Sequence, residues 1–179
     1  MVDGRVRGQS GPVVVGVDGS QGSARALAWA LREARDRQGP VRVVTAWAWG
    51  GSTGPGSAGA HVDRQARQAR QNQEALVRAV LARFPGALPQ LTAELVQGDA
   101  ASALIERAQD AELLVLGSRG LSSPADTVLG SVADACLRHC PCPVVVIPAD
   151  SPLDLPDPLQ TSGRGSGLAP AVLGAVGLP

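Results

Sequence analysis

Short apolar runs alternate along this chain with segments of helical periodicity, and that alternation restricts the folds it can adopt. The run VVVGV at residues 13–17 is rich in β-branched side chains and is typical of a strand buried on both faces of a parallel sheet. We expect strands over residues 13–17, 41–49, 91–96, 113–116 and 143–147, and helices over 23–37, 61–84, 99–108 and 131–139. Strands that alternate with helices predict right-handed βαβ units, and therefore an α/β fold around a parallel sheet.

The composition excludes several functional classes. Sixteen basic and sixteen acidic side chains cancel, so no basic excess attracts nucleic acid or an acidic membrane surface. Every basic side chain is an arginine, which excludes mechanisms that need a P-loop lysine or a Schiff-base lysine. Only 2% of the residues are aromatic, so the core must consist mainly of valine, leucine and alanine.

The ends of the chain differ in character from its middle. Residues 1–12 have no apolar region of the kind found in a signal peptide, and no apolar run approaches the ~20 residues that span a bilayer. We therefore expect a cytoplasmic protein with one folded domain over residues 12–148. A flexible N-terminus over 1–11 and a disordered tail rich in proline and glycine over 149–179 are expected to flank it.

A glycine-bearing loop follows the expected strand 113–116. Gly117 and Gly120 come directly after the strand, and Gly130 precedes the expected helix 131–139. Glycine lets the backbone approach a ligand closely and adopt a positive φ, and a helix N-terminus offers free N–H groups with a partial positive charge. This order of elements predicts a phosphate site.

Two further residues of this segment are candidates for the same site. Ser131 is expected to be the N-cap of the helix, with Asp134 in a position resembling that of a capping box. Arg119 is suited to bidentate contact with a phosphate, although a solvated loop arginine is an equal alternative.

Asp18 follows the first expected strand and belongs to the same candidate site. In parallel sheets, ligands bind beyond the carboxyl ends of the strands, where the strand order reverses. If strands 13–17 and 113–116 are neighbours, Asp18 faces the glycine loop, where its carboxylate can accept hydrogen bonds from ribose hydroxyls. The alternative is a turn aspartate that bonds its own backbone at Asp18-Gly19.

Other reactive side chains do not assemble into a catalytic group. The cluster of Cys136, His139, Cys140 and Cys142 resembles a zinc site only superficially, and buried cysteines acting as small apolar residues are the favoured interpretation. Trp47 and Trp49 are suited to base stacking, but packing against a helix is favoured. No general base is evident beside the glycine loop, so the site is interpreted as a binding site.

The spacing Gly117-x2-Gly120-x9-Gly130-Ser131 resembles the nucleotide-binding pattern of the universal stress protein family. The segments VVVGVDGS at 13–20 and RHCPCPVVVIP at 138–148 are also similar to that family, and the resemblance covers about residues 11–148. It implies a three-layer sandwich of the adenine nucleotide alpha hydrolase type. Its five-stranded parallel sheet would have the order 3-2-1-4-5, with helices on both faces.

The resemblance also implies a ligand and a set of contacts. Members with this glycine pattern bind ATP, with Mg²⁺ held mainly by the phosphates. Carried over to this chain, Asp18 would hold the ribose, and Ala46 would offer main-chain groups to the adenine. Gly16, Val17 and Leu116 would line the base and ribose pocket, and the phosphates would lie against Gly117, Gly120, Gly130, Ser131 and Val132. The last strand, Val144–Ile147, would pair edge to edge in a homodimer.

Together these features predict a nucleotide-dependent sensor or regulator of the stress response, acting through a protein partner that the sequence does not identify. A slow ATPase or phosphotransferase is one alternative, with Asp126 orienting water. A dimeric scaffold that needs no nucleotide is another, and the glycines argue against it. ADP, AMP and cyclic AMP stay open beside ATP.

Overall fold

The computed structural model describes residues 11–48, 58–122 and 128–148. The predictions of a flexible N-terminus and a disordered tail therefore fall, apart from Gly11, outside the described residues, as do Trp49 and Asp126.

Five parallel strands form one sheet in the order β3-β2-β1-β4-β5, which confirms the predicted fold class. The strands are β1 (Val13–Gly16), β2 (Val41–Trp47), β3 (Leu91–Gln97), β4 (Leu113–Gly117) and β5 (Val144–Ile147). The helices between them are α1 (Gln21–Arg37), α2 (Ala58–Leu81), α3 (Ala100–Arg107) and α4 (Ser131–His139).

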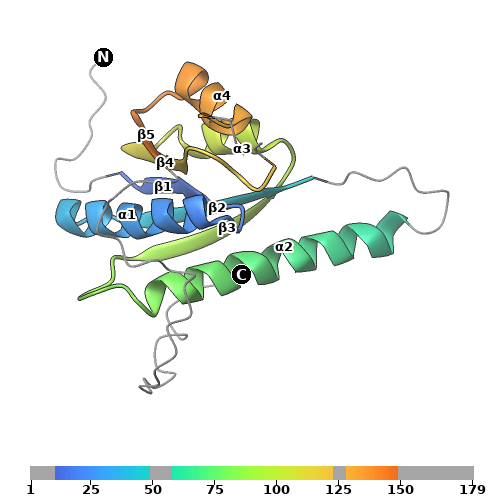
Figure 1. Cartoon of the computed structure of the whole chain (residues 1–179), viewed down its shortest axis with the longest axis horizontal. Coiled ribbons are helices and arrows are strands. Elements are labelled where there is room, and N and C mark those ends of the chain that lie inside the picture. Colours follow the sequence, from blue (N-terminus) through green and yellow to red (C-terminus); the bar gives the residue numbers. More distant parts are fainter. Residues whose placement is uncertain (1–10, 49–57, 123–127, 149–179) are drawn as a thin grey trace, which may run out of the picture.

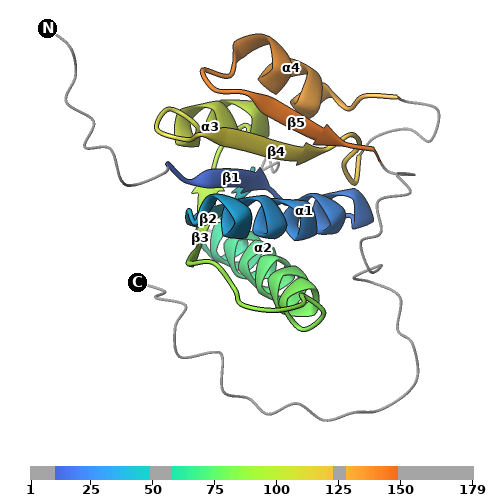
Figure 2. The same ribbon diagram turned by 90° about the vertical axis from the view of Figure 1, so that its left-hand side faces the viewer.

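Helices cover both faces of the sheet. Figures 1 and 2 show α1 and α2 on one face and α3 and α4 on the other. Because successive side chains of a strand point to opposite faces, β1 divides its valines between two apolar clusters. Val13 and Val15 pack with Leu27 and other residues of α1 and α2, whereas Val14 packs with Leu104 of α3. All three valines of this strand are fully buried, as the run VVVGV predicts.

The ends of several elements differ from the expected ones. Helix α1 begins at Gln21 because the Ser20 side chain caps it, accepting from the Ser23 N–H at 3.1 Å. Helix α2 spans 58–81 rather than 61–84. At its end, Arg83 N–H and Phe84 N–H bond the carbonyls three residues back, so the chain leaves the α-helix through a tighter turn. In the described ranges, no helix is both long and apolar enough to cross a membrane.

The centre of the sheet joins segments that lie far apart in the chain. Val13 pairs with Leu113 and Val15 with Val115, so β1 and β4 end at the same edge. There, the first turn of α1 approaches β4 so closely that a Cβ on Gly117 would lie 2.9 Å from the carbonyl carbon of Gly22. The absence of a side chain at Gly117 lets helix α1 sit against the sheet.

We expect Gly117→Ala to lower the free energy of unfolding by about 1–3 kcal/mol, because the added methyl group meets backbone atoms that cannot turn aside. Denaturant unfolding of the unliganded protein measures the difference. Gly120→Ala is the comparison: its methyl group would meet a carboxylate oxygen of Asp18, a side-chain end that can turn aside at the cost of a hydrogen bond, so we expect a smaller loss there. Equal stability of Gly117→Ala and the wild type would contradict this account of the contact.

Candidate functional site

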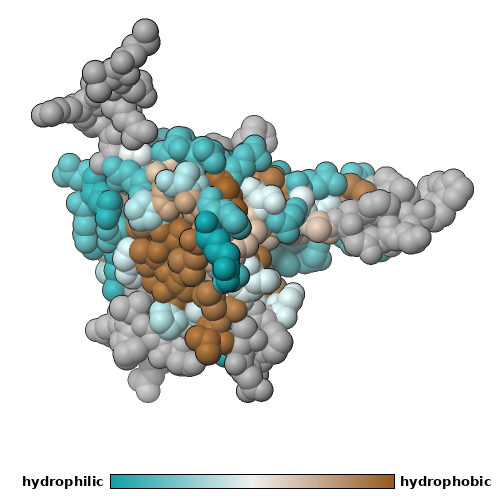
Figure 3. Space-filling view, turned by 90° about the horizontal axis from the view of Figure 1, so that it is seen from above, coloured by the Kyte–Doolittle hydropathy of each residue, from teal (hydrophilic) through white to brown (hydrophobic). Residues whose placement is uncertain are grey.

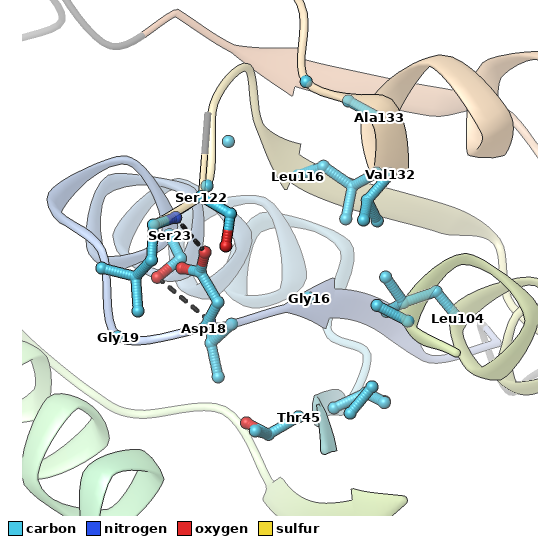
Figure 4. Close-up of a pocket in the computed structure, with 18 of the residues that line it drawn as sticks. Gly16, Asp18, Gly19, Ser23, Thr45, Leu104, Leu116, Ser122, Val132 and Ala133 are labelled. Atoms are coloured by element: carbon cyan, nitrogen blue, oxygen red, sulfur yellow. Dashed lines mark hydrogen bonds between the residues drawn. The ribbon is translucent and has the colours of Figure 1, made fainter. Parts of the chain in front are cut away.

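A cavity of about 650 Å³ opens at the carboxyl edge of β2, β1 and β4 (Figure 4). Its volume lies within the range typical of small-molecule sites, roughly 300–1,000 Å³. The structure brings every site residue predicted from the sequence to its wall: Gly16, Val17, Asp18, Ala46, Leu116, Gly117, Arg119, Gly120, Gly130, Ser131 and Val132.

Helix α4 points its N-terminus at this cavity. Its N-cap is Gly130, in an extended conformation, and among the described residues no side chain caps the helix. The prediction that Ser131 is the N-cap was therefore wrong: Ser131 is the first helical residue. Asp134 does not act as a capping-box residue either, because both of its carboxylate oxygens bind the guanidinium of Arg138, at 2.9 and 3.0 Å.

An uncapped helix N-terminus is a natural binding site for an anion. The first N–H groups of an α-helix have no partner within the helix, and the helix dipole adds a partial positive charge there. The hydrogen bond from Gly130 N–H to the Ser118 carbonyl, 2.7 Å long, ties the start of α4 to the loop after β4. Arg119, the one basic side chain among the described residues of the wall, lies in the same loop.

Asp18 links the turn after β1 to the glycine loop. Its Oδ1 accepts from the Ser20 N–H at 2.9 Å, which is the turn interaction weighed above as the alternative to a ribose contact. Its Oδ2 accepts from the Leu121 N–H at 2.8 Å, across 103 residues of sequence (Figure 4). The Ser20 and Ser23 side chains also form hydrogen bonds that stabilise this carboxylate.

Hydrogen bonding also sets the charge of this group. Neighbouring atoms partly exclude water from the Asp18 carboxylate, which disfavours the ionised form, but the hydrogen bonds from Ser20, Leu121 and Ser23 outweigh this and lower the pKa of the carboxyl below its ordinary value. Asp18 is therefore an anion at neutral pH. It is also the one acidic side chain among the described residues of the wall.

The positive φ predicted for the glycines of the site is absent at Gly117, Gly120 and Gly130. Neither Gly117 nor Gly120 has a positive φ, and Gly130 has a φ of −71°. Two of these positions have no space for a side chain. A Cβ on Gly120 would lie 2.6 Å from the Asp18 carboxylate, and a Cβ on Gly117 would meet the start of α1. In the described part of the wall only Gly19 has a positive φ, of 93°.

The end of β2 presents main-chain groups to the cavity. Val44 O accepts from Val17 N–H at 2.9 Å, where β1 ends, and Trp47 O accepts from Gly98 N–H on the β3 side. Main-chain groups alternate in direction along a strand. The N–H and carbonyl of Ala46 therefore face the β1 side, beyond the point where that strand ends.

Several residues of the wall were not found by sequence reasoning. They are chiefly Thr45 on β2, Ala69, Asn72 and Gln73 on α2, and Ala100 and Leu104 on α3. The helical spacing of Ala69, Gln73 and the buried Leu76 was a usable signal for the inner face of α2. Trp47, weighed as a stacking residue, is not among the residues of the wall.

The cysteines pack as small apolar residues. Cys136 is fully buried in the cluster beneath α4, and the Sγ atoms of Cys140 and Cys142 lie 3.6 Å apart. Burial raises the pKa of the Cys136 thiol to about 11 and that of Cys142 to about 12. Raised thiol pKa values disfavour the thiolate form that binds metals. In the ranges that the structure describes, no group of three or more metal-binding side chains gathers.

We expect Asp18→Asn to lower the free energy of unfolding at pH 7 by about 1 kcal/mol, because one of two acceptor oxygens becomes a donor on an exposed side chain. The folded-state pKa lies below the ordinary value of about 3.9, so the carboxylate's contribution is full above that pH and disappears as the pH falls through the lowered pKa. The free energies of unfolding of the two proteins should therefore approach each other as the pH is lowered from 7 to the most acidic pH at which both still fold. Asp36→Asn is the control, and a constant difference between Asp18→Asn and the wild type would refute the assignment.

The chain is similar to known proteins over most of its length. The profile of the universal stress protein family matches residues 10–148. Universal stress protein Rv2005c of Mycobacterium tuberculosis (strain ATCC 25618 / H37Rv) is 33% identical over 174 residues, covering 93% of this chain and 55% of that protein. Universal stress protein Rv2624c of the same strain is 31% identical over 140 residues, covering 75% of this chain and 47% of that protein. The chain thus spans about half the length of these curated relatives.

Solved structures share the fold. Universal stress protein UspA from Lactobacillus plantarum has a TM-score of 0.67 at 22% identity, and the match covers 79% of this chain and 99% of that chain. A universal stress protein solved in complex with cAMP is 30% identical with a TM-score of 0.50, over 79% of this chain and 99% of that chain. The family profile and the relatives above 30% identity each cover most of this chain. It therefore belongs to the universal stress protein family.

Proposed function

We propose that this protein binds an adenine nucleotide, ATP above all, in the cavity at the carboxyl edge of the sheet. The observation that carries the proposal is the juxtaposition, in one cavity, of an uncapped helix N-terminus and an ionised carboxylate on the neighbouring strand. A nucleotide needs both, since its phosphates are anions and its ribose hydroxyls are hydrogen-bond donors. The relative solved with cAMP supports an adenine nucleotide as the class of ligand.

The order of the strands predicts how the nucleotide would be oriented along the edge of the sheet. The start of α4 and the glycine loop lie beyond β4, Asp18 follows β1, and Ala46 lies on β2. Neighbouring strands lie about 4.8 Å apart, so the phosphate, ribose and base positions succeed one another across three strands. Val17 and Leu116 supply apolar walls, each 5% exposed or less. Mg²⁺ would be held mainly by the phosphates, because Asp18 is the one carboxylate among the described wall residues.

We propose that the bound nucleotide regulates contacts with a protein partner in the stress response. The hydrogen bond from Leu121 N–H to Asp18 joins the ribose position directly to the loop after β4. Leu121 and Val128 are 70% and 89% exposed, so this loop region presents apolar side chains to solvent. Among its described residues, the wall contains no histidine and no second carboxylate to serve as a general base. This composition favours binding over hydrolysis.

Charge at the start of α4 tests the phosphate position. We expect Ser131→Asp to weaken ATP binding about tenfold, because it places a negative charge beside the phosphates, whereas Ser131→Asn has nearly the same shape without the charge. Isothermal titration with ATP and Mg²⁺ measures both variants, and titration with adenosine provides the ligand without phosphates. No ATP binding by the wild type would refute the proposed function. Equal affinities of the two variants for ATP would refute the phosphate position alone.

We also propose that the protein forms a homodimer by pairing of β5 with a second copy. In the described sheet β5 is an edge strand, and Val144, Val145 and Val146 are half-buried. Figure 3 shows a hydrophobic patch on the side of the molecule that carries α4 and β5, and Leu137 on α4 is 48% exposed. An apolar edge of this kind is a template for strand pairing.

We expect Val146→Pro to convert the dimer into a monomer without unfolding it. Carbonyls of Pro143 and Ile147 accept from β4, so Val146, in the alternate position, directs its N–H to the open edge. Proline removes that outward donor and is tolerated at strand edges. Light scattering measures the mass, and thermal unfolding confirms the fold. A folded Val146→Pro dimer would contradict pairing through this edge.

A further inference from the structure

Thr45 carries a polar group that the fold leaves without a partner. The residue is 7% exposed, and its Oγ1 is the one fully buried side-chain oxygen or nitrogen among the described residues that has no hydrogen-bond partner. A buried hydroxyl without a partner destabilises a protein by roughly 1–3 kcal/mol. Valine has nearly the same shape and is as well suited to a strand as threonine, but it has no hydroxyl and would avoid that cost.

The hydroxyl lies at the wall of the nucleotide cavity. Side chains alternate along β2, so Thr45 follows Val41 and Val43 onto the face that α1 and α2 cover. Figure 4 shows its oxygen on the side of the strand that faces Asp18 and Gly19. Rotation about χ1 exchanges the hydroxyl and methyl positions, so a bound ligand can engage the oxygen without any movement of the backbone.

Two polar residues of α2 that line the same cavity form hydrogen bonds with groups other than Thr45. Gln73 is 6% exposed, and its Nε2 donates to the Glu94 carbonyl at 2.8 Å. Asn72 accepts at Oδ1 from Gln68 Nε2 at 2.9 Å. Ala69, also in the wall, has a side chain without hydrogen-bonding groups. The Thr45 hydroxyl therefore has no protein partner in this part of the wall, and rotation about χ1 is the movement that would turn it from its buried position toward the cavity.

The position of Thr45 along the sheet edge indicates which part of a bound nucleotide would lie nearest to it. Thr45 lies on β2, beyond Asp18 as seen from the phosphate position at the start of α4. The adjacent residue, Ala46, directs its main-chain groups to the same end of the cavity. A hydroxyl both donates and accepts hydrogen bonds, as do the ring nitrogens and exocyclic groups of a base edge.

From these contacts we infer that the Thr45 hydroxyl is a specificity-determining contact for the nucleobase of the bound nucleotide. This inference rests on the proposed function and assigns a side-chain contact to the base end of that site. In the free protein the hydroxyl is a cost to stability, and in the complex it gains its hydrogen bond. Removing it should therefore move stability and affinity in opposite directions, which a merely structural threonine would not do.

The test compares Thr45→Val, Thr45→Ser and the wild type by titration with ATP and Mg²⁺ and by thermal unfolding without ligand. We expect Thr45→Val to raise the Kd for ATP about three- to tenfold, as the loss of one hydrogen bond predicts. Its Tm without ligand should rise by about 2–4 °C, because the unpaired hydroxyl is gone. Thr45→Ser, which keeps the hydroxyl, should bind ATP nearly as the wild type does.

Thr92→Val is the matched control. Thr92 lies near the start of β3, away from the cavity, and its hydroxyl contacts the Val41 carbonyl at 3.5 Å. Its substitution should leave the ATP affinity unchanged. If the wild type binds ATP and Thr45→Val binds it equally well, or if Thr45→Ser is as weak as Thr45→Val, the inference is wrong while the proposed function stands. If the wild type binds no ATP, both fail together.

Discussion

The parallel pairing of β1 with β4 is the constraint on which the rest of this structure depends. These strands are separated by a hundred residues of sequence, yet Val13 lies opposite Leu113 in the centre of the sheet. That register brings the turn after β1 and the loop after β4 to one edge, where Asp18 bonds Leu121. The same pairing places the first turn of α1 against Gly117, so the close packing of α1 on the sheet also depends on it. A shift in this register would separate the carboxylate from the helix N-terminus and remove the cavity.

Strands β1, β4 and β5 were predictable because each has a continuous apolar run, and runs such as residues 13–17 arise when both faces are buried. Polar residues interrupt the apolar pattern of β2 and β3. The strand order was not contained in that pattern and came from the family resemblance. Helix ends were less well predicted, since they depend on single hydrogen bonds. Gly130 occupies the N-cap position of α4 with an extended backbone, and the Asp134 carboxylate accepts hydrogen bonds from Arg138. Neither fact follows from the order of the residues.

The residues of the site divide in the same way. Asp18 and the glycine loop were found because they follow strands directly. Thr45 was not found, because within residues 41–49 it is one more residue suited to a strand. Its significance comes from where β1 ends and where α2 passes over β2, which are properties of the assembled layers. The sequence thus predicted the part of the wall that follows β1 and β4 better than the part formed by β2.

The close contacts of Gly117 and Gly120 change what the glycine spacing means in related sequences. Both positions exclude a side chain because of neighbouring protein atoms, the backbone of α1 and the Asp18 carboxylate. A descendant that had lost its ligand would still need these glycines to keep the same packing. The presence of both glycines in a related sequence would then indicate the packing at this edge of the sheet and not the binding of a ligand. If the site binds a nucleotide as proposed, the glycine at position 130 and the unpartnered hydroxyl of Thr45 serve only that ligand, so substitutions at these two positions would be the first to follow its loss.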